Sequence, residues 1–354
     1  AQRPDLEPVP WCPDAFYLPE RPPFTFDPLL HAGAYYVQEA SSMYIRQVLQ
    51  NPLNLPLKGR LPNSSPLKGK SEGVLALDLC AAPGGKSTLL HSLLPEGSVL
   101  ICNEPIVKRA QVLAENMQKW TRGLPPTAPQ CIVTQYYPSQ FDFLTGMVDI
   151  LLADVPCSGE GMFRKDGQAV EEWSLQNVYM CQRRQREILS AIWHVLKPGG
   201  LLLYSTCTFN RHENEDNARW IQDELGGSLL SERHFLPGRE RGEGFYVAAI
   251  KASSNPSKGG GKEAVDIRRA LLPLSFGGDG GGSRGGSERA FVNLTYTEAL
   301  QYLRREALRV EAPRGPVTLC YRGLELGEGK SVGSRINNLY PEQWRIRSTY
   351  TTPF

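Results

Sequence analysis

Short apolar runs alternate with segments of helical periodicity between residues 74 and 250, and this alternation limits the folds open to the chain. The apolar runs have the length of buried strands. Strands that alternate with helices predict a parallel, doubly wound α/β sheet. We expect strands at residues 74–79, 99–103, 131–134, 149–153, 201–204 and 244–250, and helices at residues 86–94, 107–120, 175–196 and 212–225. The Lys-Pro-Gly-Gly run at residues 197–200 predicts the stop of the third helix.

Composition divides the 354 residues into five parts. Residues 1–50 are expected to pack on the α/β domain, first as Pro-rich extended chain and then as a helix from about Glu39. We predict a flexible insertion at residues 51–72, the α/β domain at residues 73–252 and a Gly/Ser-rich linker region at residues 253–290. Residues 291–354 predict a small β-rich module with a helix at residues 297–308. The first residue is Ala1, and we expect the chain to begin inside a longer protein.

Charge and cysteine usage narrow the class of protein. The net charge of +2 gives no strong global field, although residues 262–354 hold 14 Lys/Arg against 10 Asp/Glu. That mild excess hints at a module that binds a polyanion. The eight cysteines form no CxxC pair and the five histidines share no ligand spacing, so we expect no metal and a reducing cytoplasm. No apolar run approaches the ~20 residues that a membrane span needs.

The stretch ADVPCSGEGMFRKD at residues 153–166 contains the first candidate site residues. It follows an apolar strand, and an acid (Asp154), a proline (Pro156) and a cysteine (Cys157) lie close together in the sequence where that strand is expected to end. In open α/β sheets ligands bind beyond the carboxyl ends of the strands. Asp154 and Cys157 are therefore expected to line an active site.

LDLCAAPGGKS at residues 77–87 reads as a strand, a glycine turn and a helix start. Free N–H groups at a helix start favour an anionic or carboxylate-bearing ligand. A P-loop would need glycine at position 80, which is Cys80, and the GxGxxG pattern of NAD sites is missing. Glu104 follows the next strand, about twenty residues after the turn, where an acid is placed to bind the hydroxyls of a ribose.

Cys207 follows the fifth strand in LLLYSTCT, fifty residues after Cys157. If the two strands are neighbours, both sulfurs face one crevice, and such a thiol can be a thiolate of lowered pKa. Single cysteines are more often small buried hydrophobes, which is how we interpret Cys12, Cys80, Cys102, Cys131, Cys181 and Cys320. The acidic run at residues 213–216 is interpreted as a helix cap, and the polar run at residues 182–186 as a solvated helix face.

The three motif blocks stand in the order and spacing of one known family. Over residues 9–250 the chain resembles the Nop/Sun family of RNA (cytosine-5)-methyltransferases, which use S-adenosylmethionine. GEGMFRKD, VPWCPDAFYLPE and NNLYPEQWRIRS are similar to its RsmF type, bacterial enzymes that modify 16S ribosomal RNA and carry a C-terminal PUA-like RNA-binding module. The resemblance implies a Rossmann-like methyltransferase domain followed by a small α+β, β-rich PUA-like module. It also implies ribosomal RNA or the small ribosomal subunit as the partner; we expect a monomer.

The resemblance implies a role for each site residue. Cys207 would attack C6 of the cytosine, and Cys157 would help to release the product by assisting removal of the C5 proton. Asp154 would lie between cofactor and base and bind the N3/N4 edge of the cytosine. Lys86 would reach toward the base, and Glu104 would hold the ribose of the cofactor. The methionine part of the cofactor would lie against Cys80, Ala81, Ala82, Pro83, Gly84, Gly85 and Lys86.

One neighbourhood departs from the pattern of the family, which carries an acid for the adenine end after the third strand. Here Tyr136 and Tyr137 follow that strand, and we expect Tyr137 to contact the adenine. We also expect the N-terminal part of the RsmF type to be missing. Other substrates remain open: transfer RNA, or DNA with Cys157 as the nucleophile. A non-catalytic RNA-binding assembly factor is the third possibility, which the presence of Asp154, Cys157 and Cys207 argues against.

Overall fold

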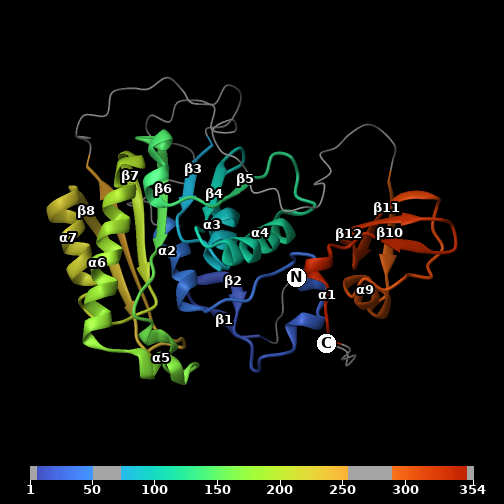
Figure 1. The fold of residues 1–354 in the computed structure, drawn as a ribbon, viewed down its shortest axis with the longest axis horizontal. Coiled ribbons are helices and arrows are strands. Elements are labelled where there is room, and N and C mark those ends of the chain that lie inside the picture. The colour runs from blue at the N-terminus through green and yellow to red at the C-terminus, as the bar shows by residue number, and fades with distance from the viewer. Residues whose placement is uncertain (1–5, 51–72, 254–288, 349–354) are drawn as a thin grey trace. The chain divides into compact units, whose positions relative to one another are not determined.

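The computed structural model describes residues 6–50, 73–253 and 289–348, which form two compact units (Figure 1). The first unit comprises Ala1–Tyr17, Val37–Leu113 and Pro126–Leu274, and the second comprises Leu18–Tyr36, Ala114–Pro125 and Ser275–Phe354. The predicted insertion at residues 51–72 and most of the predicted linker at residues 253–290 lie outside the described residues.

The first unit is built on a seven-stranded sheet of order β5-β4-β3-β6-β7-β9-β8. Five neighbouring strands, from β5 to β7, run parallel, as the alternating pattern predicts. Their bounds are Leu75–Asp78 for β3, Val99–Asn103 for β4, Gln130–Thr134 for β5, Val148–Asp154 for β6 and Leu196–Thr206 for β7. The Rossmann-like architecture expected of the domain is therefore present.

The other edge of the sheet is antiparallel, so the prediction of an all-parallel sheet is wrong there. β9 (Phe245–Ala252) inserts between β7 and β8 (Gly227–Phe235) and runs antiparallel to both. The connection from β8 to β9 spans residues 236–244, which is too short for the crossover that a parallel pair needs. β8 itself was not predicted, because its residues alternate between partly buried and exposed and form no apolar run.

Helices flank the sheet at α3 (Gly85–Leu93), α4 (Val107–Thr121), α6 (Leu175–Ile192) and α7 (Glu215–Leu225), close to the predicted ranges. The Lys-Pro-Gly-Gly run does not follow α6 directly. It lies inside β7, where Val148 pairs with Leu196 and Ile150 pairs with Leu201. The four residues therefore form a bulge, a place where a strand tolerates proline.

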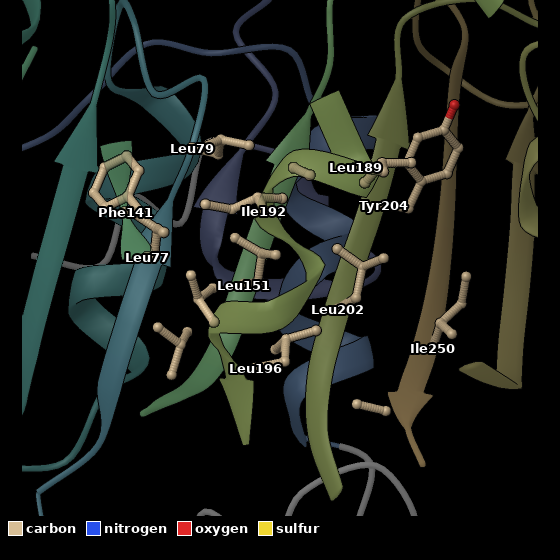
Figure 2. Close-up of a cluster of buried hydrophobic side chains, with 14 of the residues drawn as sticks. Leu77, Leu79, Phe141, Leu151, Leu189, Ile192, Leu196, Leu202, Tyr204 and Ile250 are labelled. Carbon is tan, nitrogen blue, oxygen red and sulfur yellow. The ribbon is translucent and has the colours of Figure 1, made fainter. Parts of the chain in front are cut away.

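Both faces of the sheet are covered. Figure 2 shows Leu77, Leu151 and Leu202 of adjacent strands in one cluster with Leu189 and Ile192 of α6, and all five side chains are fully buried. The residues that alternate with them along the strands are also fully buried, among them Ala76, Ile150 and Leu203. Strands buried on both faces read as continuous apolar runs, which is why the sequence pattern located them.

The N-terminal residues are less extended than predicted. A hairpin of β1 (Pro8–Val9) and β2 (Cys12–Phe16) comes first, and α1 (Pro28–His31) follows as a single turn that Asp27 caps. Proline is tolerated in α1 because it stands at the first helical position. The helix expected from Glu39 starts as a 3-10 turn, Ser41–Tyr44, and continues as α2 (Ile45–Gln50). In unit one, α5 (Gly167–Glu172) precedes α6.

The second unit contains a four-stranded sheet of order β10-β11-β12-β13 with the helix α9. The bounds are Ala290–Leu294 for β10, Tyr296–Leu303 for α9, Gly315–Tyr321 for β11, Leu324–Ser331 for β12 and Ile336–Asn338 for β13. α9 ends earlier than predicted, and Arg305 then takes a positive φ of 62°. Phe26 from the N-terminal region joins the apolar core of this unit together with Tyr302 and Tyr340.

Candidate active site

The site residues lie at the carboxyl ends of neighbouring strands. β4, β3, β6 and β7 stand side by side in the sheet, and parallel strands end at the same edge. Glu104 follows β4, the glycine turn follows β3, Asp154 ends β6 and Cys207 follows β7. The topology thus brings together segments that are far apart in the sequence.

The turn from Cys80 to Gly85 is tied to the next strand. The N–H of Ala81 donates to the carbonyl of Asn103 at 2.8 Å, and the Asn103 amide donates to Leu79 and Tyr136 carbonyls. Gly84 takes a φ of 116°, a left-handed conformation that favours glycine, and α3 begins at Gly85. The start of α3 therefore presents its N–H groups at this turn, which suits a carboxylate.

Two buried acids flank the turn. Asp78 accepts a hydrogen bond from the Ser87 hydroxyl at 2.6 Å, and burial raises the pKa of Asp78 to about 7. Glu104 is 1% exposed, accepts from the N–H of Ile106 at 3.0 Å and lies 3.3 Å from Arg109. A carboxylate at this strand end can accept hydrogen bonds from vicinal hydroxyls, so this acceptor fits a nucleoside-type ligand.

The two tyrosines after β5 differ in environment. The Tyr136 ring packs edge-to-face on Phe141, with ring centroids 5.6 Å apart, and contributes to the core. The Tyr137 side chain is 66% exposed, and its backbone N–H donates to Gln140. Tyr137 is therefore the more accessible of the two.

Cys157 and Cys207 meet at the end of the sheet, with their Sγ atoms 3.1 Å apart. Cys207 is exposed and Cys157 is half-buried. The N–H of Gly161 donates to the Cys207 carbonyl at 2.8 Å, which fixes one cysteine loop against the other. A Cβ atom on Gly161 would lie 2.6 Å from that carbonyl oxygen, so this close approach requires glycine.

The two thiols are shifted in opposite directions. The hydrogen bond from Cys157 lowers the pKa of Cys207, and the nearby Lys86 ammonium lowers it further, while desolvation and the Asp154 carboxylate act against the shift. The same hydrogen bond, followed by burial, raises the pKa of Cys157 well above its ordinary value. The two opposite shifts favour the thiolate form at Cys207 and the thiol form at Cys157.

Asp154 and Lys86 form an ion pair beside the sulfurs. The Lys86 Nζ lies 2.7 Å from the Asp154 Oδ2, and the Ser205 hydroxyl donates to the Asp154 Oδ1 at 2.8 Å. Burial alone would lower the pKa of Lys86, but the Asp154 carboxylate raises it overall. The ammonium also lies 5.3 Å from the centroid of the Phe245 ring. A cation is therefore held next to the exposed thiol.

Buried acids hold the two cysteine loops. Glu213 is fully buried and accepts from the N–H of Ser158 at 3.0 Å and from the Gln185 amide at 2.7 Å. Glu160 accepts from the hydroxyl of Thr208 at 2.6 Å and from the N–H of Phe209 at 2.9 Å. Each cysteine loop thus carries an acid that accepts hydrogen bonds from the other loop. These contacts together fix the distance between the two sulfurs.

Two sequence interpretations are corrected by these contacts. Glu215 and Asp216 lie in the first turn of α7, as the helix-cap interpretation expects, but Glu213 precedes the helix and binds the Cys157 loop. Gln185, in the run interpreted as a solvated face, is fully buried and donates to the carbonyl of Pro156. The signal was present in the spacing, because Gln185 shares a helix face with the buried Val178, Leu189 and Ile192.

A second pair of sulfurs, Cys102 and Cys131, lies 3.7 Å apart, but burial and that contact raise the pKa of Cys102. All eight are free thiols; Cys12, Cys102 and Cys320 are buried, and Cys80 lies half-buried in the turn. Burial raises the pKa of Cys80, which makes it a poor nucleophile. Among residues 6–50, 73–253 and 289–348, no three His, Cys, Asp or Glu side chains are placed to bind a metal. Within the same ranges no helix is long and apolar enough to cross a membrane.

Three comparisons with known families cover both ends and the middle of the chain. Residues 66–251 match the family described as 16S rRNA methyltransferase RsmB/F. Residues 289–346 match the methyltransferase RsmF PUA domain, and residues 1–40 match the N-terminal domain of 16S rRNA methyltransferase RsmF. At least part of the N-terminal domain that we expected to be missing is therefore present.

Curated relatives share these regions. The ribosomal RNA small subunit methyltransferase F of Aliivibrio fischeri is 32% identical over 279 residues, which are 71% of this chain and 53% of that protein. The protein of the same name from Shewanella oneidensis is 32% identical over 266 residues, 69% of this chain and 51% of the relative. The chain thus spans about half the length of the curated relatives it matches.

Solved structures agree in fold. A methyltransferase homolog from Pyrococcus horikoshii aligns with a TM-score of 0.54 and 25% identity, covering 70% of this chain and 78% of that one. NSun6 from the same organism, solved with SFG, aligns with a TM-score of 0.52 and 24% identity, over 68% of this chain and 58% of that one. Since the RsmB/F match alone covers more than half of the 354 residues, the chain belongs to the 16S rRNA methyltransferase RsmB/F family.

Proposed function

We propose that the chain transfers a methyl group from S-adenosylmethionine to C5 of a cytosine in ribosomal RNA, 16S RNA in particular, through a covalent bond between Cys207 and C6. The observation that carries the proposal is the pair of sulfurs 3.1 Å apart whose pKa values shift in opposite directions beside the Lys86–Asp154 ion pair. Cytosine C5 is a poor nucleophile until a thiolate adds at C6, so an ionised sulfur is the group this reaction needs.

The residues around the turn fit the cofactor. S-adenosylmethionine, when bound, supplies an electrophilic methyl group on a sulfonium. The proposed contacts of its methionine part are the N–H groups at the start of α3 and the Cys80-to-Lys86 turn, with Ala81, Ala82, Pro83, Gly84 and Gly85 between them. Glu104 accepts from the ribose hydroxyls, and Asp154 lies between the cofactor and the base.

The first step uses Cys207 and Asp154. The thiolate of Cys207 adds to C6, and the electron pair of the C5–C6 double bond moves into the ring, where charge accumulates toward N3. Asp154 binds the N3/N4 edge of the cytosine, and the Lys86 ammonium beside it supports that charge. C5 then takes the methyl group. The base must leave its stack to reach these groups.

The second step uses Cys157. Once Cys207 is bonded to carbon it carries no negative charge, so the interaction that holds the proton on Cys157 disappears and the pKa of Cys157 falls. Cys157 then loses its own proton to solvent, and the resulting thiolate takes the C5 proton. The electrons of the C5–H bond restore the C5–C6 double bond, and the Cys207–C6 bond breaks to return the thiolate.

The proposal is tested by methyl transfer with the chain itself. The protein is incubated with S-adenosylmethionine labelled in its methyl group and with bare 16S RNA, small ribosomal subunits or transfer RNA in separate reactions. The RNA is then digested to nucleosides. We expect the label in 5-methylcytidine. Label in another nucleoside, or no label in 16S RNA or small subunits, contradicts the proposal. Label in transfer RNA alone would show that transfer RNA, not ribosomal RNA, is the substrate.

Lys86→Gln is expected to shift the pH dependence of the reaction. The Lys86 cation lowers the pKa of Cys207, so its removal raises that pKa and moves the acid limb of kcat/KM to higher pH. A rise of about one unit would cost roughly ten-fold in activity below both pKa values and nothing above them. Alkylation of Cys207 by iodoacetamide, followed against pH without RNA, measures the same shift directly. Lys86→Arg keeps the cation, and an equal shift in that variant would contradict the electrostatic cause.

Tyr137→Ala is expected to weaken S-adenosylmethionine binding, because the exposed ring is the proposed partner of the adenine. Stacking on an aromatic ring is worth about 1–3 kcal/mol, so we expect the Kd to rise roughly ten-fold. Calorimetric titration of the cofactor measures the effect, and Tyr137→Phe should retain the affinity. Unchanged binding in Tyr137→Ala removes Tyr137 from the site.

A further inference from the structure

The first turns of α6 carry a hollow that the proposed chemistry does not use. It has a volume of about 580 Å³ and is lined by Leu175, Gln176, Tyr179, Gln182 and Arg183. We call it the α6 pocket. These residues recur at helical spacing, so they form one face of α6, beside the buried face that carries Val178 and Leu189.

Large apolar side chains are exposed around the α6 pocket. Leu175 is 51% exposed and Tyr179 is 42% exposed. The segments just before the pocket add Met162, Val170 and Trp173 to the exposed apolar surface, and Figure 1 shows α5 beside the first turns of α6. A patch of this kind, rimmed by polar groups, is typical of a binding surface.

The α6 pocket adjoins the loop that follows Cys207, and the buried face of the same helix contacts the Cys157 loop. The Gln182 amide donates to the carbonyl of His212 at 2.6 Å, and the Tyr179 and His212 rings lie 4.9 Å apart. His212 is in the loop that follows Cys207. One turn further along α6, Gln185 donates to the carbonyl of Pro156, the residue before Cys157. A ligand in the pocket therefore lies next to a loop that would hold the target base.

The lining has the chemistry that recognises an unstacked nucleobase. An exposed aromatic ring provides a stacking surface, and the amides of Gln176 and Gln182 can bind base edges. The guanidinium of Arg183 can stack on a base or pair with a phosphate. Extrusion of a target base also deprives its neighbour in the strand of a stacking partner, so a replacement surface close to the site stabilises the extruded state.

We propose that the α6 pocket binds an unstacked nucleobase that flanks the target cytosine, with Tyr179 as the stacking platform and Arg183 as the cationic contact. The proposal rests on the function proposed above, because it assigns a second RNA contact to the same site. One nucleotide beside the target cytosine therefore contributes to RNA binding through its base.

Matched variants of adjacent residues on α6 test the α6 pocket. Tyr179→Ala is compared with Met180→Ala, and Arg183→Ala is compared with Arg184→Ala, since Met180 and Arg184 are exposed on α6 but do not line the pocket. Binding of a short single-stranded RNA that contains the target cytosine is measured by fluorescence anisotropy, which needs no methyl transfer. We expect a loss of about ten-fold for Tyr179→Ala, a smaller loss for Arg183→Ala, and retention by Tyr179→Phe. Thermal unfolding checks that each variant is folded.

Abasic scanning of the RNA separates stacking from other effects. In the wild type, removal of one flanking base should weaken binding as much as Tyr179→Ala does. In Tyr179→Ala, removal of the same base should cause no further loss. Additive losses, or equal affinities in the matched pairs, overturn the proposal. So does a defect of Tyr179→Ala on assembled subunits with unchanged RNA affinity, which would indicate a protein partner instead.

The outcomes distinguish the two proposals. If the wild type transfers methyl groups but the matched variants have equal RNA affinities, the proposed function is supported and the proposed base-binding role of the α6 pocket is wrong. If the variants differ in RNA binding as expected but no 5-methylcytidine forms, the base-binding role of the α6 pocket is supported and the proposed reaction is wrong.

Discussion

Cys207→Ala is expected to reduce methyl transfer to RNA by at least about a thousand-fold, because the variant removes the only group proposed to add to C6. The pKa of Cys207 is the one lowered in the pair, and the side chain is exposed at the end of the sheet. Cys157 is not expected to take its place, because the proposal assigns it to removal of the C5 proton. Single-turnover transfer of a labelled methyl group measures the loss.

A second cysteine of the same unit provides the control for this loss. Cys181 is a half-buried free thiol on α6, and Cys181→Ala should retain wild-type transfer. Cofactor binding by Cys207→Ala should also be intact, because the turn after β3 is unchanged. A rate within ten-fold of the wild type in Cys207→Ala would show that Cys207 is not the nucleophile.

Cys157→Ala is expected to accumulate a covalent protein–RNA complex. The variant keeps the Cys207 thiol but lacks the group proposed to take the C5 proton, so the adduct forms and its release is blocked. Turnover should fall by about a hundred-fold or more, the size of effect that loss of a general base produces. The complex is detected as a band of reduced mobility on a denaturing gel with labelled RNA and S-adenosylmethionine.

Reversed roles of the sulfurs would give the opposite pattern. With Cys157 as the nucleophile, the complex would vanish in Cys157→Ala and accumulate in Cys207→Ala. The double variant Cys157→Ala/Cys207→Ala should form none, and a complex in that protein would point to a third attachment point. Alanine is preferred to serine at position 157, because a serine hydroxyl there could still bind the Cys207 sulfur.

Much of the first unit could be predicted from sequence because its central strands are buried on both faces. Continuous apolar runs such as residues 148–154 then mark strands, and their carboxyl ends mark the site. The meeting of Cys157 and Cys207 followed from one assumption, that β6 and β7 are neighbours, and their pairing confirms it. The catalytic and cofactor-binding roles of these residues stay predictions.

The parts that were missed share a physical cause: their patterns depend on tertiary contacts. β8 is an edge strand with a partly exposed face, so no apolar run marks it. Glu213 and Gln185 are polar residues buried by mutual hydrogen bonds, and composition assigns such residues to the surface. The α6 pocket could not be predicted from sequence, because Tyr179 and Arg183 lie in a helix whose other face packs on the core.

The bond between Cys207 and a pyrimidine ring is the claim on which this account depends, and RNA with 5-fluorocytidine at the target tests it in the wild-type protein. Fluorine at C5 cannot leave as a proton does, so the adduct should persist after methyl transfer. The complex is digested with protease and nuclease, and mass spectrometry locates the modified residue. We predict a methylated fluoropyrimidine nucleotide on the peptide that contains Cys207. Attachment to Cys157, or no covalent complex although 5-methylcytidine forms on unmodified RNA, would contradict the account.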